Sequence, residues 1–174
     1  MKRQELAAGW KLLWHGREIE TQIPCSLYGD LTRCGEIADP YYRDNETEAF
    51  ALSREDCTYA LTFSADGDLL SCARLLLRFE MIDTLADVWL NGTCVGSACN
   101  MHRVWEFPVK GVLREGTNRL EVRLHAPLPF LEQQVAENGS IPCNGVTVDG
   151  FPYLRKSSCM FGWDWGPRLP DMGL

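Results

Sequence analysis

The chain has 174 residues, of which 45% are hydrophobic and 24% are charged, a composition typical of one globular domain. Its formal net charge of −7 argues against nucleic acid or an anionic membrane surface as the main partner. No apolar segment follows the basic pair Lys2-Arg3, and no apolar run approaches the roughly 20 residues that a transmembrane helix needs. We therefore expect no signal peptide, no membrane partner and a cytoplasmic location.

The first third of the chain predicts a strand, a short helix and a loop. The apolar residues of the segment 10–14 suit an edge strand with aromatic packing. Ser26 is placed to cap a short helix over residues 27–34, and Gly35 is placed to end it. Residues 39–46 combine turn formers and aromatics without periodicity, so we expect an ordered loop there.

The middle of the chain predicts a series of strands. Residues 58–63 alternate and end in a turn at 65–68, and residues 73–79 resemble a more buried strand. Asn91-Gly92 separates two apolar runs, which is a strong hairpin signal because both residues tolerate a positive φ. Residues 119–125 alternate, with leucine and valine facing inward. Short strands separated by turns predict an all-β fold, an antiparallel β-sandwich.

The last quarter of the chain differs from the rest. Residues 126–153 contain four prolines and several glycines, so we expect a long irregular segment. Trp163 and Trp165 then flank Asp164, and in an extended strand the two indoles would point to one face and the carboxylate to the other. The chain stops at Leu174 without a closing element, from which we expect a larger parent protein.

The eight cysteines do not have the spacing of a metal site. No C-x-x-C pair occurs, and the closest two are Cys94 and Cys99. We expect free thiols, several of them buried as small hydrophobic residues, and neither a metal nor a cofactor. No nucleophile–histidine–acid set and no phosphate-binding glycine loop is visible either.

Several stretches together resemble the β-mannosidases of glycoside hydrolase family two. The most specific is Arg155-Lys156 followed by Phe-Gly-Trp-Asp-Trp-Gly-Pro at residues 161–167, and the resemblance covers nearly the whole chain. Other matching stretches are Ile23-Pro24, Asp39-Pro40-Tyr41-Tyr42, Asn45-Glu46, residues 82–92, residues 100–103 and residues 113–120. Phe50 and a position near Cys57 depart from the family pattern, which usually has tryptophan there.

The resemblance implies that residues 1–174 form a single amino-terminal domain of a larger retaining glycosidase. This domain would be a jelly-roll-like, galactose-binding-domain-like sandwich, followed by an immunoglobulin-like domain and a TIM barrel. Two glutamates of the barrel would hydrolyse terminal non-reducing β-D-mannose residues. We therefore expect no catalytic residue in this chain, an inactive isolated fragment, and two partners: the carbohydrate substrate and the downstream catalytic domain.

The resemblance also implies that Asp164 binds the sugar in the −1 subsite. An ionised carboxylate accepts strong hydrogen bonds from sugar hydroxyls, and a neighbouring indole offers an apolar wall to a sugar ring. Trp165, Trp163 and Arg155 complete the candidate substrate-binding set, whereas Lys156 is expected in solvent. The alternative is that both tryptophans anchor the core and that Asp164 binds nearby backbone.

Two other functions fit the same fold. A free-standing carbohydrate-binding module would use exposed tryptophans as a platform and bind sugar alone. A sister glycosidase would have β-galactosidase or β-glucuronidase activity.

Overall fold

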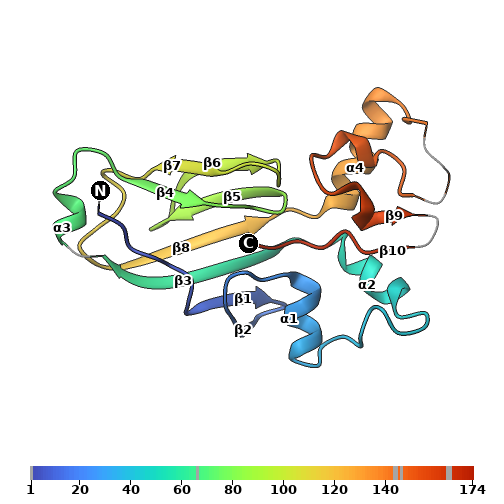
Figure 1. Ribbon diagram of the computed structural model, residues 1–174, viewed down its shortest axis with the longest axis horizontal. Coiled ribbons are helices and arrows are strands. Elements are labelled where there is room, and N and C mark those ends of the chain that lie inside the picture. Colours follow the sequence, from blue (N-terminus) through green and yellow to red (C-terminus); the bar gives the residue numbers. More distant parts are fainter. Residues whose placement is uncertain (1, 66, 143–144, 146, 164–165) are drawn as a thin grey trace.

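A six-stranded antiparallel sheet forms the main layer of the computed structural model, which describes residues 2–65, 67–142, 145, 147–163 and 166–174 (Figure 1). Across the sheet the strands are β2 (Arg17–Thr21), β1 (Trp10–Trp14), β3 (Cys57–Ala65), β8 (Gly116–Leu124), β5 (Leu85–Leu90) and β6 (Thr93–Cys99). A two-stranded sheet of β4 (Leu76–Phe79) and β7 (Trp105–Pro108) packs on it. The predicted all-β antiparallel sandwich is confirmed.

The register of the long central pair explains the alternation in the sequence. β3 and β8 pair from Cys57 opposite Leu124 to Ala65 opposite Gly116. Leu120, Val122 and Leu124 are fully buried as a result, and the residues between them face outward. The Asn91-Gly92 hairpin joins β5 to β6, and both of its residues have a positive φ, as predicted.

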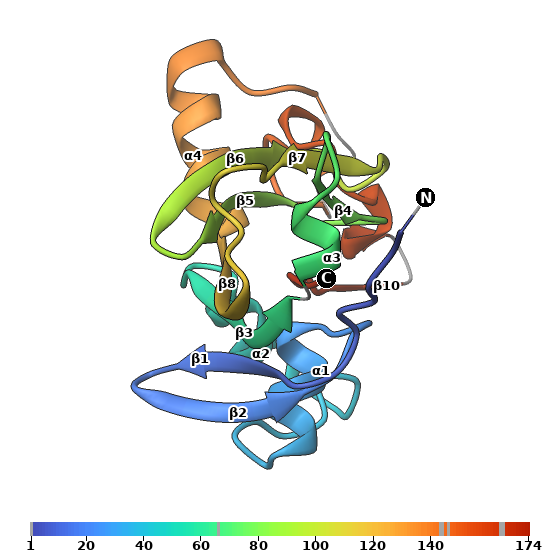
Figure 2. The same cartoon turned by 90° about the vertical axis from the view of Figure 1, so that its left-hand side faces the viewer.

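The two layers meet in one hydrophobic core. Phe107 of β7 lies directly over Gly96 of β6, where an added Cβ would stand 2.4 Å from the phenylalanine ring. Tyr59, Leu12 and Val88 contribute fully buried side chains from the main sheet. The terminal segment 171–174 also enters this core, and both views place the C-terminal end in the middle of the molecule (Figures 1 and 2).

Four α-helices and two 3₁₀ turns complete the described part of the chain. They are α1 (Leu27–Arg33), α2 (Glu46–Leu52), α3 (Gly67–Leu70), α4 (Pro127–Asn138), η1 (Phe151–Tyr153) and η2 (Ser158–Met160). The predicted short helix is confirmed as α1, and the Ser26 side chain accepts a hydrogen bond from the Gly29 N–H at 3.1 Å. No helix among these is long and apolar enough to cross a bilayer.

Three expectations about individual elements are wrong. β1 is an inner strand, because β2 pairs with its outer side and forms the edge. The segment 73–79 forms only the short β4, and none of its residues is fully buried, because its sheet is only two strands wide. The segment 126–153 contains α4, whose two prolines lie in its first turn, where the missing N–H groups have no helical partner in any case.

The seven cysteines that the structure describes are all free. Only Cys57 is buried, while Cys34, Cys94, Cys99 and Cys159 are exposed. The expectation that several thiols pack in the core therefore holds for Cys57, and in part for Cys25, which packs half-buried against the same core.

Figure 1 shows that three of the helices and a small hairpin lie at the two ends of the main sheet. Helix α3 lies at one end. At the other end lie α2, α4 and a small hairpin of β9 (Phe161–Trp163) and β10 (Gly166–Arg168).

Candidate functional site

The β9–β10 hairpin carries the motif that the sequence analysis singled out. Trp163 pairs with Gly166 and Phe161 pairs with Arg168, and a further backbone hydrogen bond of 2.9 Å joins Leu169 N–H to Met160 O. Asp164 and Trp165 lie between the two strands in sequence and outside the described residues.

Trp163 lies on the surface. It is 45% exposed at the end of β9 and is one of four large hydrophobic residues that the described part of the chain exposes. The two residues before it are buried, so the buried part of β9 holds the backbone of an exposed tryptophan in place.

The first strand of the hairpin is held by a small core of its own. Phe161 is fully buried together with Leu131 of α4 and Leu154, and its ring stacks on Phe151 with centroids 5.8 Å apart. The Phe161 carbonyl also accepts a hydrogen bond of 3.1 Å from the Val148 N–H. Helix α4, which the sequence did not predict, therefore supports the hairpin.

The second strand is held by α2. Glu46 accepts a hydrogen bond of 2.8 Å from the Arg168 N–H, and it also pairs with the Arg168 guanidinium. That guanidinium lies over the ring of Phe50 at 5.3 Å from its centroid. Leu169 is buried against Ala49 of α2.

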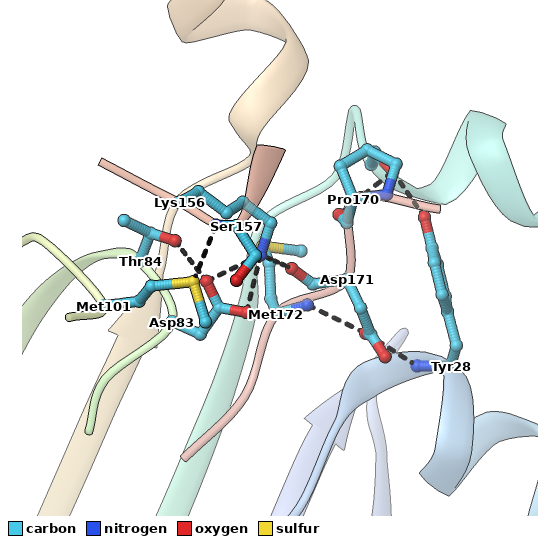
Figure 3. Close-up of polar contacts among 10 residues, drawn as sticks. Tyr28, Asp83, Thr84, Met101, Lys156, Ser157, Pro170, Asp171 and Met172 are labelled. Atoms are coloured by element: carbon cyan, nitrogen blue, oxygen red, sulfur yellow. Dashed lines mark hydrogen bonds and ion pairs between the residues drawn. The ribbon is translucent and has the colours of Figure 1, made fainter. Parts of the chain in front are cut away.

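The base of the hairpin segment contains a buried ion pair (Figure 3). The Lys156 ammonium lies 2.6 Å from each carboxylate oxygen of Asp83 and also donates to the Asp171 carbonyl. Lys156 is only 4% exposed, so the expectation of a solvated lysine is wrong. Burial lowers the pKa of Lys156, and the Asp83 carboxylate opposes that shift. No local sequence signal could have found a partner 73 positions away.

The Asp171 side chain ties the segment after β10 to helix α1. Its carboxylate accepts hydrogen bonds from the Tyr28 N–H at 3.0 Å and the Met172 N–H at 2.8 Å. Burial raises the pKa of Asp171, and these bonds oppose the shift. The adjacent Pro170 carbonyl accepts a hydrogen bond from the Ser53 hydroxyl, which also contacts the hydroxyl of Tyr28.

The Arg155 side chain is exposed, while its backbone is fixed. Arg155 forms a parallel bridge with Asn100, and its carbonyl accepts a hydrogen bond of 3.0 Å from the Met101 N–H. The Met101 sulfur in turn accepts from the Ser157 N–H at 3.0 Å. The turn over residues 100–103 therefore braces the hairpin segment against the sandwich.

A further cluster of titratable groups in the described part of the chain surrounds His125. His125, at the end of β8, contacts Asp87 at 3.0 Å and Asp56 at 3.3 Å, and Asp56 also accepts from the N–H of Ala126 before α4. Burial lowers the pKa of His125, but the two carboxylates outweigh it, so the pKa is raised overall. The described residues contain no group of three or more side chains that could hold a metal ion.

Comparison with known proteins places this geometry in a family. The family model of the glycosyl hydrolase 2 galactose-binding domain-like domain matches residues 7–174. β-Mannosidase from Bos taurus is 31% identical over 180 residues, which cover 97% of this chain and 20% of that protein. β-Mannosidase A from Emericella nidulans is 32% identical over 161 residues, which cover 89% of this chain and 17% of that protein.

Solved structures agree with the sequence comparison. A crystal structure of β-D-mannosidase from Dictyoglomus thermophilum superposes with a TM-score of 0.93 at 33% identity, over 99% of this chain and 22% of that one. A β-glucuronidase from an uncultured Clostridium superposes over 70% of this chain and 22% of that one, with a TM-score of 0.52 at 21% identity, and so shares the fold. The chain spans about a fifth of the length of the relatives it matches. It belongs to the glycosyl hydrolase 2 galactose-binding domain-like family.

Proposed function

We propose that this chain is the amino-terminal, non-catalytic domain of a retaining β-mannosidase that removes terminal non-reducing β-D-mannose residues. The similarity to β-mannosidases over nearly the whole chain supports this assignment. Retaining hydrolysis needs two carboxyl groups about 5–5.5 Å apart on either side of the scissile bond. The proposal assigns both to a TIM barrel in the other four fifths of such an enzyme, beyond an immunoglobulin-like domain.

The observation that carries the site is the exposed indole of Trp163 on an anchored hairpin. A large aromatic side chain that is held at the surface before ligand arrives saves the entropy of ordering it on binding. We propose that Trp163 lines the −1 sugar subsite and that Asp164, the next residue in sequence, accepts hydrogen bonds from the sugar hydroxyls. Arg155 and Trp165 complete the proposed set. The roles of Asp164 and Trp165 rest on the family resemblance alone.

The test compares the full-length gene product with residues 1–174 on a panel of aryl β-glycosides. We expect only the full-length protein to hydrolyse them, and the mannoside to be the preferred substrate. Turnover by the fragment would contradict the non-catalytic role. A full-length protein that cleaves no β-mannoside would contradict the enzyme assignment.

Two substitutions in the full-length protein test the subsite. Asp164→Ala should lower kcat/KM for the mannoside by roughly 10²-fold, because hydrogen bonds to a charged group contribute about 1.5–3 kcal/mol each. Trp163→Ala should lower it about tenfold. Trp89→Ala is the matched control, since Trp89 lies on β5 under the Arg123 guanidinium at 4.4 Å, away from the hairpin. Equal effects of Trp89→Ala and Trp163→Ala would refute the subsite role.

Exposure of Trp163 also fits a second function, a carbohydrate-binding module that acts alone. The two functions differ in what residues 1–174 do without other domains. Calorimetric titration with mannose and manno-oligosaccharides should show no binding at micromolar concentration if the site needs a second domain. Tight binding by residues 1–174 alone would favour the module.

We further propose that the protein works in the cytoplasm. All seven described cysteines are free and four are exposed, which suits a reducing compartment. Thiol titration of the protein purified without reductant should recover these thiols, and fractionation of cells should find the protein in the cytoplasm. Export of the protein would overturn this placement.

A further inference from the structure

Lys156 is a buried charge for which the proposed chemistry has no direct use. Its ammonium does not reach the surface, so it cannot contact a sugar. We propose that Lys156 is the positioning residue of the β9–β10 hairpin, and that its contacts with Asp83 and Asp171 set where Trp163 is presented to substrate. This inference rests on the proposed subsite.

The first argument is the closure of a loop. Lys156 precedes β9, and Asp171 follows β10. The bond from the Lys156 ammonium to the Asp171 carbonyl joins two positions 15 residues apart, with the whole hairpin between them. The ammonium therefore closes the base of the loop that carries Trp163. Figure 3 shows Lys156 between Asp83 and Asp171.

The second argument is the connection of that base to the main sheet. Asp83 lies just before β5, and Thr84 donates a hydrogen bond to its carboxylate. The Asp83 backbone also exchanges two hydrogen bonds with Gly173, of 2.9 and 3.0 Å. One carboxylate thus fixes the lysine relative to both the sheet and the terminal segment.

The third argument is direction. A lysine ammonium has three hydrogen-bond donors, and here three acceptors face it: both Asp83 oxygens and the Asp171 carbonyl. An apolar pair of the same size would fill the space, but it would allow the segments around Lys156, Asp83 and Asp171 to shift relative to one another, since hydrophobic contacts are not directional. An ammonium whose three donors all have acceptors favours a single arrangement of the segments that carry Lys156, Asp83 and Asp171.

The experiment uses the full-length enzyme and separates positioning from stability. Lys156→Met with Asp83→Leu removes both charges together, so that no unpaired charge is buried, and such replacements are often neutral for stability. We expect this double variant to keep its melting temperature within a few degrees while KM for an aryl β-mannoside rises about tenfold. Val122→Ala, at a fully buried position of β8, is the matched control. It should lower the melting temperature and leave KM unchanged.

Two results would overturn the inference. One is a double variant with KM and kcat both within twofold of the parent. The other is a rise of KM in Val122→Ala equal to that in the double variant, because general loosening would then explain both. If the double variant does not fold, Lys156→Gln with Asp83→Asn takes its place, since this pair buries no unpaired charge and the glutamine amide has two donors in place of the three of the ammonium; an unchanged KM there also rejects the inference.

Trp163→Ala in the same enzyme separates this inference from the proposed function. If Trp163→Ala raises KM and the double variant does not, the subsite stands and the positioning role fails. If Trp163→Ala and Asp164→Ala both leave kcat/KM unchanged, the subsite itself fails and the positioning role fails with it.

Discussion

Gly173→Ala is expected to destabilise the domain strongly, because Gly173 lies against backbone and has no space for a methyl group. An added Cβ would stand 2.0 Å from the Cys25 carbonyl oxygen and 3.0 Å from the Ser26 Cα. Both are backbone atoms, so no side-chain rotation relieves the contact. The terminal segment would have to move away from its neighbours.

The cost follows from the hydrogen bonds that such a movement breaks. Gly173 exchanges two with Asp83, and Leu174 exchanges two with Cys25, at distances of 2.9 to 3.3 Å. At about 1 kcal/mol each, their loss amounts to about 4 kcal/mol. With a urea dependence of about 2 kcal/mol per molar, the unfolding midpoint should fall by about 2 M.

Urea unfolding followed by tryptophan fluorescence measures this shift. Gly166→Ala is the matched control, because its added Cβ would meet only the Cβ of Trp163 at 3.6 Å and its backbone nitrogen at 3.9 Å, which are ordinary contacts. We expect the free energy of unfolding of the control to lie within about 0.5 kcal/mol of that of the parent. Equal midpoints for the two variants would refute the packing argument.

Three further predictions concern other parts of the domain. Ser26→Ala removes the side-chain cap of α1 and should lower the free energy of unfolding by about 1 kcal/mol in thermal unfolding; no change would mean that water replaces the cap. Phe161→Ala should lower the free energy of unfolding, measured by urea titration, by about 3–5 kcal/mol. Arg54→Ala, which breaks only an exposed ion pair, should lower it by less than about 1 kcal/mol. A larger loss for Arg54→Ala than for Phe161→Ala would contradict the packing of the hairpin. Since the pKa of His125 is raised, the folded state keeps its proton at pH values where the unfolded chain has lost it. The resulting stabilisation is complete below about pH 6.5 and is lost as the pH rises through the raised pKa, so His125→Gln should flatten the pH dependence of urea midpoints in that window; an unchanged slope would reject this account.

The elements that the sequence predicted are those with local signals. Alternation along residues 119–125, the Asn91-Gly92 turn and the Ser26 cap each act over a few positions, and each appears in the structure. The edge of the sheet could also have been predicted. β2 carries charges on every outward position and buries only Ile19, which is typical of an edge strand.

The features that could not be predicted depend on distant partners. α4 has prolines in its first turn, and only its packing against Phe161 shows why a helix forms there. Lys156 resembles any surface lysine in sequence, because Asp83 is far away along the chain. The hairpin motif was recognised from sequence. The three contacts that hold the hairpin, with α4, with α2 and through the Lys156–Asp83 pair, were not.

The bond between Tyr28 and Asp171 has a consequence for synthesis on the ribosome, because it joins positions 143 residues apart. At about 5–20 residues per second, roughly 7 to 30 seconds separate the emergence of the two. During that time Leu27 and Leu31 of α1 lack two other members of the hydrophobic core in which they are buried, Met172 and Leu174. The core around α1 therefore stays incomplete until residues 171–174 have been made, and during this interval its apolar side chains offer a binding surface to a chaperone.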